Sequence, residues 1–526
     1  MKINKYILFI LCLALILRLF NINWDNSNHL HPDERFLTMV VSSVSLKSLN
    51  PADHGFDFYV YGTFPLLITR TLGQITHYTS YDKIFLIGRF LSTIFDVGTC
   101  YLIFLISNIL FKKKSIALWA AFFYAIAVFP IQQAHFFTVD SFTVFFSTIS
   151  IYFLLKKNYL LSGFLFGLTL ACKMSLIIIL PFLLLFIFNN QKKNKIFEII
   201  KFLIMLFISF RIFQPYAFIG LFNINPLFIK NISTASKMIT GEIDYPPNIQ
   251  WAYTVPLIHP LINIFLVGLG PVLTIFSIIS IFVSKFKHKS LLILVISSIF
   301  VYQGFQLAKY MRYFYPFYPY LCIFAAAYFV KLKPKKLFLI LITIPTILFM
   351  TIYMRPNSRV TASKWITDNI PKNKTLTAES WDDALPLQNP GYKVIYLDLY
   401  NEDNEAKWDK LSLQLSQVDY LIISSNRLLK SIPRMPQRYP ITSIFYKKLL
   451  NNETGFLLIK KIYSYPIFND ELVEESFSVY DHPVIYIFKK QKSFVFDYTK
   501  NIPKAIYLNP SETSFNLIDK IKQWIF

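Results

Sequence analysis

The sequence predicts a polytopic α-helical membrane protein with a soluble α/β domain at its C-terminal end. The first observation is composition, since the 526-residue chain is 54% hydrophobic and 18% aromatic with a mean hydropathy of +0.45. This apolar share exceeds that of ordinary soluble domains. The second is a series of long apolar segments separated by lysine clusters. The third is a change in the residue pattern after Met354, where short runs of β-branched and aromatic residues replace the long apolar segments.

Eleven apolar segments are candidates for transmembrane helices, which need about 20 apolar residues each. The fifth and sixth are short and nearly contiguous. The segments cover residues 5–22, 82–110, 115–131, 139–155, 159–172, 174–189, 196–213, 261–283, 290–306, 316–330 and 337–353. No small-residue cleavage site follows the first segment, so we expect an uncleaved helix rather than a signal peptide.

The positive charge of the chain sets the predicted orientation in the membrane. Lysine clusters lie at residues 112–114, 156–157, 192–195, 285–289 and 331–336, between apolar segments. With the N-terminus inside, strict alternation places every cluster on the cytoplasmic side, as the positive-inside rule requires. The net charge of +23 therefore does not indicate nucleic-acid binding, which concentrates Lys and Arg on one face or arm. Residues 21–81, 214–260 and everything after Met354 are then outside.

The predicted domains are a membrane domain over residues 1–354, with its first external loop at 21–81, and an extracytoplasmic domain over 355–526. Short β-branched or aromatic runs predict five strands in the second domain. These runs are KTLTAES, KVIYLDLY, VDYLIISS, GFLLIKKIY and PVIYIFKK. They alternate with polar helical stretches, so we expect a small α/β fold.

Asp33 and Glu34 are the candidate catalytic residues. They lie in the first external loop, in the sequence NINWDNSNHLHPDERF, about ten residues beyond the first helix. A carboxylate at the membrane boundary can take a proton from an acceptor hydroxyl, and its neighbour can orient it or bind a sugar. The alternative is a solvated loop with ordinary surface charges.

The pattern around this pair resembles the glycosyltransferase C superfamily, especially bacterial relatives of the protein O-mannosyltransferases and aminoarabinose transferases. Further similar segments are YVYGTFPLLITRTLG (59–73), AHFFTVDSFTVFF (134–146), GLTLACKMS (167–175), FRIFQPYAF (210–218) and KYMRYFYP (309–316). The resemblance implies a phospholipid carrier-dependent enzyme that inverts the anomeric centre. It also implies Asp33 as the base and Glu34 as its supporting neighbour.

Basic residues predicted at the outer face are candidates for binding the donor phosphate, because a cation stabilises the negative charge that develops on the leaving group. Lys309 and Arg312 are three residues apart and share a face if the segment is helical. Lys173 lies outside, against the positive-inside pattern, and Arg211 lies near the outer end of the seventh segment. The alternatives are contact with lipid head groups and snorkelling to the interface.

Four residues are candidates for positioning the substrate: His31, Tyr61, His135 and Asp140. An ionisable residue at a membrane boundary is a functional hypothesis by default. For Asp140 the alternative is an N-cap of the next helix.

We predict no metal and no other cofactor. His29 and His31 with the acidic pair suit a divalent ion by ligand type, but loop spacing alone is weak evidence. The four cysteines lie far apart in apolar segments and indicate neither disulfides nor a zinc site. Glu379, Asp382, Asp383 and the SVYDHP segment at 478–483 are assigned to turns.

The sequence therefore predicts an inverting glycosyltransferase of the plasma membrane, with its soluble domain extracytoplasmic. Its expected partners are a polyprenyl-phosphate sugar donor, an acceptor protein, glycan or lipid, and membrane lipids. The main alternative is a transporter or lipid flippase. Against it, the chain shows no internal repeat, and its notable charges lie at one face. An assembly or receptor protein anchored by the helices is a third possibility, although eleven spans exceed the need of an anchor.

Overall fold

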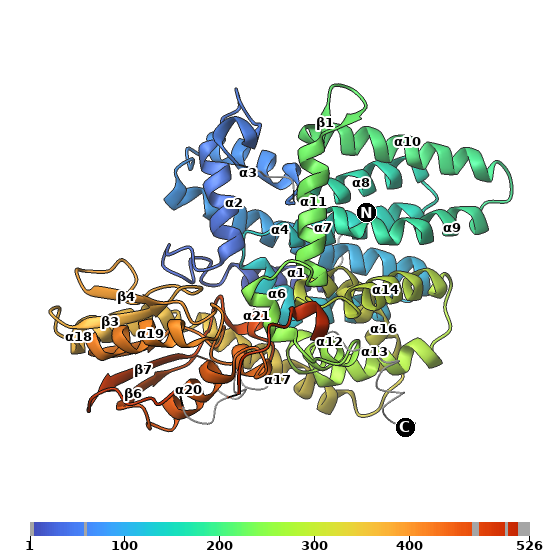
Figure 1. Ribbon diagram of the computed structural model, residues 1–526. Coiled ribbons are helices and arrows are strands. Elements are labelled where there is room, and N and C mark those ends of the chain that lie inside the picture. The colour runs from blue at the N-terminus through green and yellow to red at the C-terminus, as the bar shows by residue number, and fades with distance from the viewer. Residues whose placement is uncertain (1–4, 57–59, 465–472, 500–502, 514–526) are drawn as a thin grey trace, which may run out of the picture.

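The computed structural model describes residues 5–56, 60–464, 473–499 and 503–513, and it divides into a helical body and a C-terminal sheet domain (Figure 1). Tyr59, which begins one of the segments quoted above, and residues 514–526 of the predicted second domain lie outside the described residues.

Each of the eleven apolar segments overlaps one helix or a run of consecutive helices. In order these are α1 (Lys5–Leu19), α4 (Tyr81–Phe111), α5 (Lys114–Ala125) with α6 (Val128–Ala134), α7 (Asp140–Leu155), α8 (Tyr159–Cys172), η2 (Met174–Ile179) with α9 (Leu180–Asn190), α10 (Lys195–Phe213), α12 (Ile258–Asn263) with η5 (Ile264–Gly268) and α13 (Pro271–Val283), α14 (Lys289–Gly304), α15 (Met311–Phe314) with η6 (Tyr315–Phe317) and α16 (Tyr318–Phe329), and α17 (Lys335–Tyr353).

Two helical runs in the described part of the chain are long and apolar enough to cross a membrane: Tyr81–Phe111, and Lys335–Asn369, which continues α17 into α18. The pair α5 and α6 makes a third if it counts as one span bent by 57°. Several other helices are apolar but shorter. The helices thus suit insertion into a membrane, while the predicted number of eleven spans stays a prediction.

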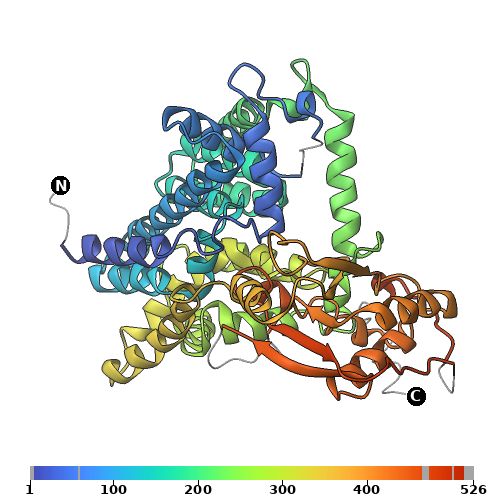
Figure 2. The same ribbon diagram turned by 90° about the vertical axis from the view of Figure 1, so that its left-hand side faces the viewer.

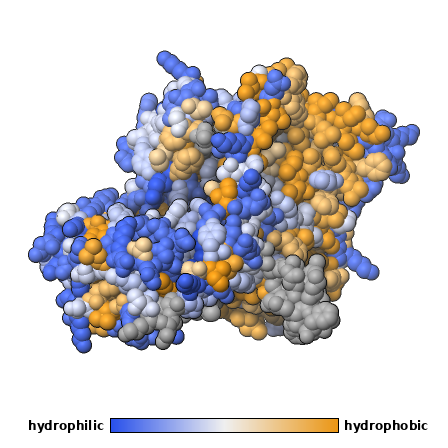
Figure 3. Space-filling view, viewed as in Figure 1, coloured by the Kyte–Doolittle hydropathy of each residue, from blue (hydrophilic) through white to orange (hydrophobic). Residues whose placement is uncertain are grey.

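Apolar side chains gather on one flank of the helical body. Figure 3 shows them over α8 to α10, whereas hydrophilic residues cover most of the C-terminal domain. Along α10, Ile196, Phe197, Ile204 and Ile212 are more than half exposed. A continuous exposed apolar surface of this kind is expected where lipid contacts the protein.

A buried ion pair connects the helices of the body. Arg18 near the end of α1 binds Asp96 in α4, and both side chains are fully buried. The hydroxyl groups of Tyr124 and Tyr315 donate to the same carboxylate. The remaining guanidinium donors reach backbone oxygens, including that of Ala125 at 2.8 Å. Buried charges require such complete pairing, because an unpaired ion in a low-dielectric interior costs several kcal/mol.

The two predicted external segments fold into helices beside the C-terminal domain. The first supplies α2 (Pro32–Ser43), η1 (Pro51–His54) and α3 (Thr63–Ile75). The second supplies η3 (Pro215–Ala217), the short strands β1 (Phe218–Ile219) and β2 (Asn223–Ile224), α11 (Pro226–Thr240) and η4 (Pro246–Trp251). Figure 2 shows α2 and α11 standing upright over the C-terminal domain.

All five predicted strands of the C-terminal domain are confirmed: β3 (Thr375–Glu379), β4 (Lys393–Leu397), β5 (Tyr420–Ile423), β6 (Phe456–Ile462) and β7 (Ile485–Lys490). The sheet order is β4-β3-β5-β7-β6. β3 is parallel to β4 and β5, and β7 is antiparallel to β5 and β6. The helices are α18 (Ser358–Asn369), α19 (Glu405–Gln417), α20 (Pro440–Leu450) and α21 (Glu475–Ser478), with short turns η7 (Ile432–Arg434) and η8 (Pro510–Thr513). Separate apolar clusters contain Trp408 with Phe445 and Ile366 with Leu376.

Candidate active site

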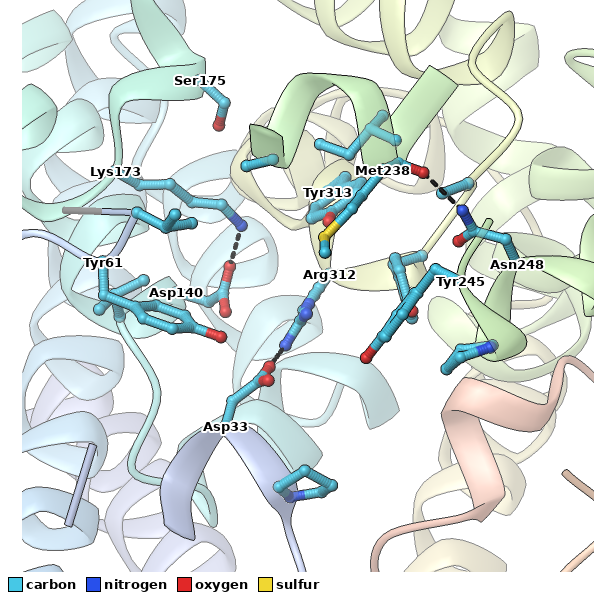
Figure 4. A pocket seen from close by; sticks show the side chains of 18 of the residues that line it. Asp33, Tyr61, Asp140, Lys173, Ser175, Met238, Tyr245, Asn248, Arg312 and Tyr313 are labelled. Carbon is cyan, nitrogen blue, oxygen red and sulfur yellow. Dashed lines mark hydrogen bonds and ion pairs between the residues drawn. The ribbon is translucent and has the colours of Figure 1, made fainter. Parts of the chain in front are cut away.

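A cavity of about 680 Å³ lies where the two external segments meet the C-terminal domain. Its walls come from the start of α2, the segment before α3, the end of α8 with η2, α11, the residues around α15, and loops of the C-terminal domain. Several sequence-predicted site residues line it: Asp33, Tyr61, Asp140, Lys173 and Arg312. Figure 4 shows their polar groups pointing toward one shared space.

Asp33 enters the cavity from the first turn of α2. His31 caps this helix by accepting a hydrogen bond from the backbone of Glu34 at 3.3 Å, and Pro32 occupies the first helical position. Such a helix N-terminus favours a carboxylate. Arg312 forms an ion pair with Asp33, and about a fifth of each side chain is exposed to the cavity. The predicted base and one predicted phosphate ligand are therefore in direct contact.

A second ion pair lies in the same cavity. Lys173 Nζ is 2.7 Å from Asp140 Oδ1, and the ammonium also lies 4.7 Å from the ring centroid of Tyr313. Asp140 is the first residue of α7, while Lys173 directly follows α8. In Figure 4 the ring of Tyr61 lies beside this pair. Asp140 is thus the first helical residue of α7 and not its N-cap, which is Val139, and it lines the cavity.

Glu34 is fully buried and does not line the cavity. Arg89 Nε lies 3.1 Å from both of its carboxylate oxygens, and the backbone N–H of Phe137 donates to Oε2 at 2.6 Å. Asp25 completes this ion cluster. The contacts fix the first turn of α2 against α4, so Glu34 supports the position of Asp33 and does not itself face a substrate.

Besides Glu34 and His31, three of the predicted site residues lie outside the cavity lining, which corrects the sequence expectation for their position. Lys309 is buried, its Nζ bonds to Thr254 Oγ1 at 3.3 Å, and burial lowers the pKa of its amine to about 8. Arg211 donates to the backbone oxygens of Gly220 and Leu221. His135 is buried in a stack on Tyr353, with ring centroids 3.9 Å apart. Sequence spacing places such residues at the outer face but does not fix side-chain direction.

His31 lies beneath the cavity rather than in its lining. Its ring stacks on Tyr480, which does line the cavity, with centroids 4.0 Å apart. Burial, followed by the positive charge of Arg312, lowers the pKa of His31 well below its usual value. The imidazole is therefore neutral, consistent with its role as hydrogen-bond acceptor at the helix cap.

The C-terminal domain supplies a wall that sequence reasoning missed. Asp382, Asp383 and Tyr480 were assigned to turns, and the structure places these turns against the cavity. Other lining residues that were not predicted include Trp381, Arg427 and Glu475 of this domain and Tyr245 of the second external segment. One available signal was the position of Trp381 and Asp382 directly after a predicted strand, since loops at the carboxyl ends of parallel strands commonly bind ligands.

Charges on this wall are neutralised by partners. Arg359 binds Asp382 at 2.6 Å, and Arg35 of α2 binds Asp383 at 2.7 Å. Although burial acts to raise the pKa of Asp383, Arg359 and Arg35 lower it below its usual value. Asp383 therefore stays ionised, and its contact with Arg35 joins the domain to the helix that carries Asp33.

Among the described residues, no group of three or more His, Cys, Asp or Glu side chains is placed to hold a metal ion. His29, one of the metal ligands considered from the sequence, packs against the rings of Tyr81 and Phe85, at centroid distances of 4.1 and 4.8 Å.

Comparison with protein families identifies one match. Residues 82–219 match the family of dolichyl-phosphate-mannose-protein mannosyltransferases. This segment contains Asp140 and Lys173, whereas Asp33 and Arg312 lie outside it. The transporter alternative receives no support from this match. A comparison with curated protein sequences finds no match.

Solved structures similar to this chain include two with low sequence identity to it. The oligosaccharyltransferase of Archaeoglobus fulgidus in its apo form has a TM-score of 0.49 and 14% identity, with 86% of this chain and 73% of that chain covered. ArnT from Cupriavidus metallidurans bound to undecaprenyl phosphate has a TM-score of 0.48 and 10% identity, with 92% and 98% covered.

The family match tests the resemblance to the glycosyltransferase C superfamily that the sequence motifs predict. That resemblance is confirmed over the matched segment, which includes one of the two ion pairs of the cavity. Residues 82–219 are therefore similar to the dolichyl-phosphate-mannose-protein mannosyltransferases, a family of lipid-linked glycosyltransferases.

Proposed function

We propose that this protein transfers a sugar from a polyprenyl-phosphate donor to an acceptor at the outer face of the plasma membrane, with inversion at the anomeric carbon. The observation that carries the proposal is the presence of two ion pairs, Asp33 with Arg312 and Asp140 with Lys173, in one cavity. Each pair offers a base and a cation, which are the two kinds of group that such a transfer needs.

In the proposed reaction Asp33 accepts the proton of the acceptor hydroxyl. The hydroxyl oxygen attacks the anomeric carbon from the face opposite the phosphate. As the new carbon–oxygen bond forms, the bond to the phosphate oxygen breaks and its electron pair stays on the phosphate. Arg312 and Lys173 stabilise the resulting charge. Lys309 and Arg211 have no such part, because neither lines the cavity.

The cavity offers an apolar side for the lipid carrier. Ile177 and Ile178 of η2 line it from one direction, and Ile232 and Ile239 of α11 line it from another. Burying isoprene units there is favourable by roughly 25 cal/mol per Å² of apolar surface. The same surface lies beside the ionic centre, so a lipid tail and its phosphate can be bound together.

The experiment uses purified full-length protein and a panel of undecaprenyl- and dolichyl-phosphate sugars, with release of polyprenyl phosphate as the readout. We expect one donor to be turned over and Asp33→Asn to lower kcat by about 100-fold or more, because the general base is lost. Asp53→Asn, an exposed carboxylate of the same external segment, is the matched control. Full transfer by Asp33→Asn would refute the assignment of the base.

A further inference from the structure

Two loops at the carboxyl edge of the C-terminal sheet reach the cavity. Ser380, Trp381, Asp382 and Asp383 follow β3 directly, and Arg427 follows β5. These strands are parallel neighbours in the interior of the sheet. Ligands of open α/β sheets bind outside the carboxyl ends of such strands. The domain therefore presents its usual ligand-binding edge to the membrane site.

The loop after β3 is held in one conformation by contacts at consecutive residues. Arg427 donates from Nη1 to the backbone oxygen of Trp381 at 2.9 Å and from Nε to Glu475 at 3.0 Å. Arg359 and the hydroxyl of Ser425 both bind the carboxylate of Asp382. A loop fixed in this way loses little conformational entropy when it binds a ligand.

Trp381 is the unusual member of this loop. Its side chain is 42% exposed even though the loop is fixed and lines a cavity. Tyr245, from the second external segment, meets it edge-on at a centroid distance of 6.2 Å. A large aromatic surface left open beside charged groups provides an apolar plane with polar groups at its border. A sugar ring matches this chemistry, because it has an apolar C–H face and hydroxyls at its edge.

The alternative ligand, a peptide, does not fit the same wall. Extended peptides commonly bind by adding a strand to an exposed sheet edge. The edges of this sheet are β4 and β6, and no residue of either is in the cavity lining. The strands that face the cavity end there and already have a neighbour on each side. The charged groups of the wall are also paired with one another, which leaves no excess charge to select a charged peptide.

We propose that Trp381, Asp383, Arg427 and Tyr245 form the acceptor subsite and that the acceptor is a glycan. The inference rests on the proposed transferase function and adds its acceptor class. Trp381 carries the sugar ring on its indole face. Asp383 and Arg427 hydrogen-bond the hydroxyls at the edge of the ring. The bound sugar then presents one hydroxyl toward Asp33, which lines the same cavity.

The test follows the Trp381 indole directly in the full chain. Protein labelled with 5-fluorotryptophan is titrated with soluble oligosaccharides of mannose, glucose and N-acetylglucosamine, and separately with Ser- and Thr-containing peptides. Trp381→Phe identifies the Trp381 fluorine resonance by its absence. We expect at least one oligosaccharide to shift this resonance at millimolar concentration and the peptides to leave it unchanged. A shift with peptides alone, or with neither class, would overturn the proposal.

A second measurement separates this proposal from the transferase assignment. Trp381→Ala is expected to weaken oligosaccharide binding by at least tenfold and to leave binding of undecaprenyl phosphate unchanged. Tyr396→Ala removes an aromatic ring that is 54% exposed on β4, outside the cavity lining, and is the matched control. Loss of undecaprenyl phosphate binding in Arg312→Ala supports the transferase site alone. If Trp381→Ala binds the oligosaccharide as the unmodified protein does, the acceptor subsite is wrong while the transferase assignment stands.

Discussion

At the scale of single residues, the lining of the cavity gives a different order of the candidate cations from the one that the sequence predicts. From the sequence, Lys309 and Arg312 are the strongest candidates for binding the donor phosphate, ahead of Lys173 and Arg211. Only Lys173 and Arg312 line the cavity, and each faces a carboxylate. Because these two cations already neutralise an acidic partner, the proposed binding of a phosphate requires it to compete with Asp140 and Asp33 for them.

The position of each arginine relative to the cavity predicts a large effect for one substitution and a small effect for the other. Arg312→Ala should lower kcat/KM for the donor by about 10²- to 10³-fold, the usual effect of losing a group that stabilises the leaving oxyanion. Arg211→Ala removes the same charge from an exposed site whose donors reach only backbone oxygens, and should change kcat/KM less than twofold. Steady-state kinetics with the donor found active above give the comparison. Equal losses in both variants would contradict the placement of the phosphate.

The buried carboxyl group of Glu379 should make the free energy of unfolding depend on pH. It is buried at the end of β3 and accepts a hydrogen bond from Tyr446 at 2.6 Å, and burial raises the pKa of its carboxyl to about 8. Between the unfolded pKa near 4.5 and about 8, the folded state holds a proton that the unfolded state has lost. Stability therefore falls as pH rises through this window.

Glu379→Gln should remove this dependence, since the amide is neutral at every pH and keeps an acceptor oxygen. The variant should melt at a higher temperature than the unmodified protein at pH 8 and at the same temperature at pH 4.5. The upper limit of the gain is about 4–5 kcal/mol, from about 1.4 kcal/mol per pKa unit. Thermal melts across this range measure it, with Glu402→Gln, an exposed carboxylate of the same domain, as control.

At the scale of secondary-structure elements, close packing of α3 on α8 positions two cavity residues. Gly62 precedes α3, and its N–H donates to the backbone oxygen of Cys172 at the end of α8, at 3.0 Å. A Cβ at position 62 would lie 1.8 Å from the oxygen of Ala171. Tyr61 and Lys173 flank this contact, so the approach of the two backbones brings both into the cavity.

Gly62→Ala is therefore expected to separate α3 from α8 and to displace Tyr61 and Lys173. Donor turnover should fall at least tenfold, and the melting temperature should drop, because backbone atoms rather than a flexible side chain must move. Gly55→Ala offers a comparison, since no atom lies within 4 Å of a Cβ there, although its positive φ adds some strain. Normal turnover in Gly62→Ala would show that the contact does not position the site.

Local elements were predictable because they depend on local patterns. Each apolar segment became helix, and each β-branched run after Met354 became a strand. Ion pairs between distant elements were not predictable. Arg89 meets Glu34 across 55 residues and Arg18 meets Asp96 across 78, and no spacing rule connects such residues. In the site, Asp33 and Asp140 were found through motifs, whereas Trp381 and Arg427 needed the sheet to place them.

At the scale of the whole molecule, the C-terminal domain is joined to the helical body through buried contacts. Phe477 packs in the apolar core of the helices, 5.8 Å from the ring of Phe349. Asp481 binds Gln132 of α6 and the hydroxyl of Tyr353 in α17, the latter at 2.8 Å. The domain is thus part of the enzyme and more than an appendage to it.

Removing residues 355–526 should therefore abolish transfer and also destabilise the helices. We expect the truncated chain to insert into membranes but to be cleaved by protease within α6 or α17, where the full chain resists. Limited proteolysis of membranes, together with release of polyprenyl phosphate, measures both effects. An anchor model predicts instead that the truncated helices still resist protease and that, in the full chain, substitution of Asp33 has no effect.

The order of the sheet also determines when this enzyme becomes competent during its synthesis. β7 is the last strand along the described part of the chain, yet it lies inside the sheet between β5 and β6. The ribosome must therefore deliver residue 490, of 526, before the domain can close and complete the cavity. A nascent chain with all its membrane segments inserted therefore still lacks part of the wall of the cavity, because Glu475 and Tyr480 line it and are made late.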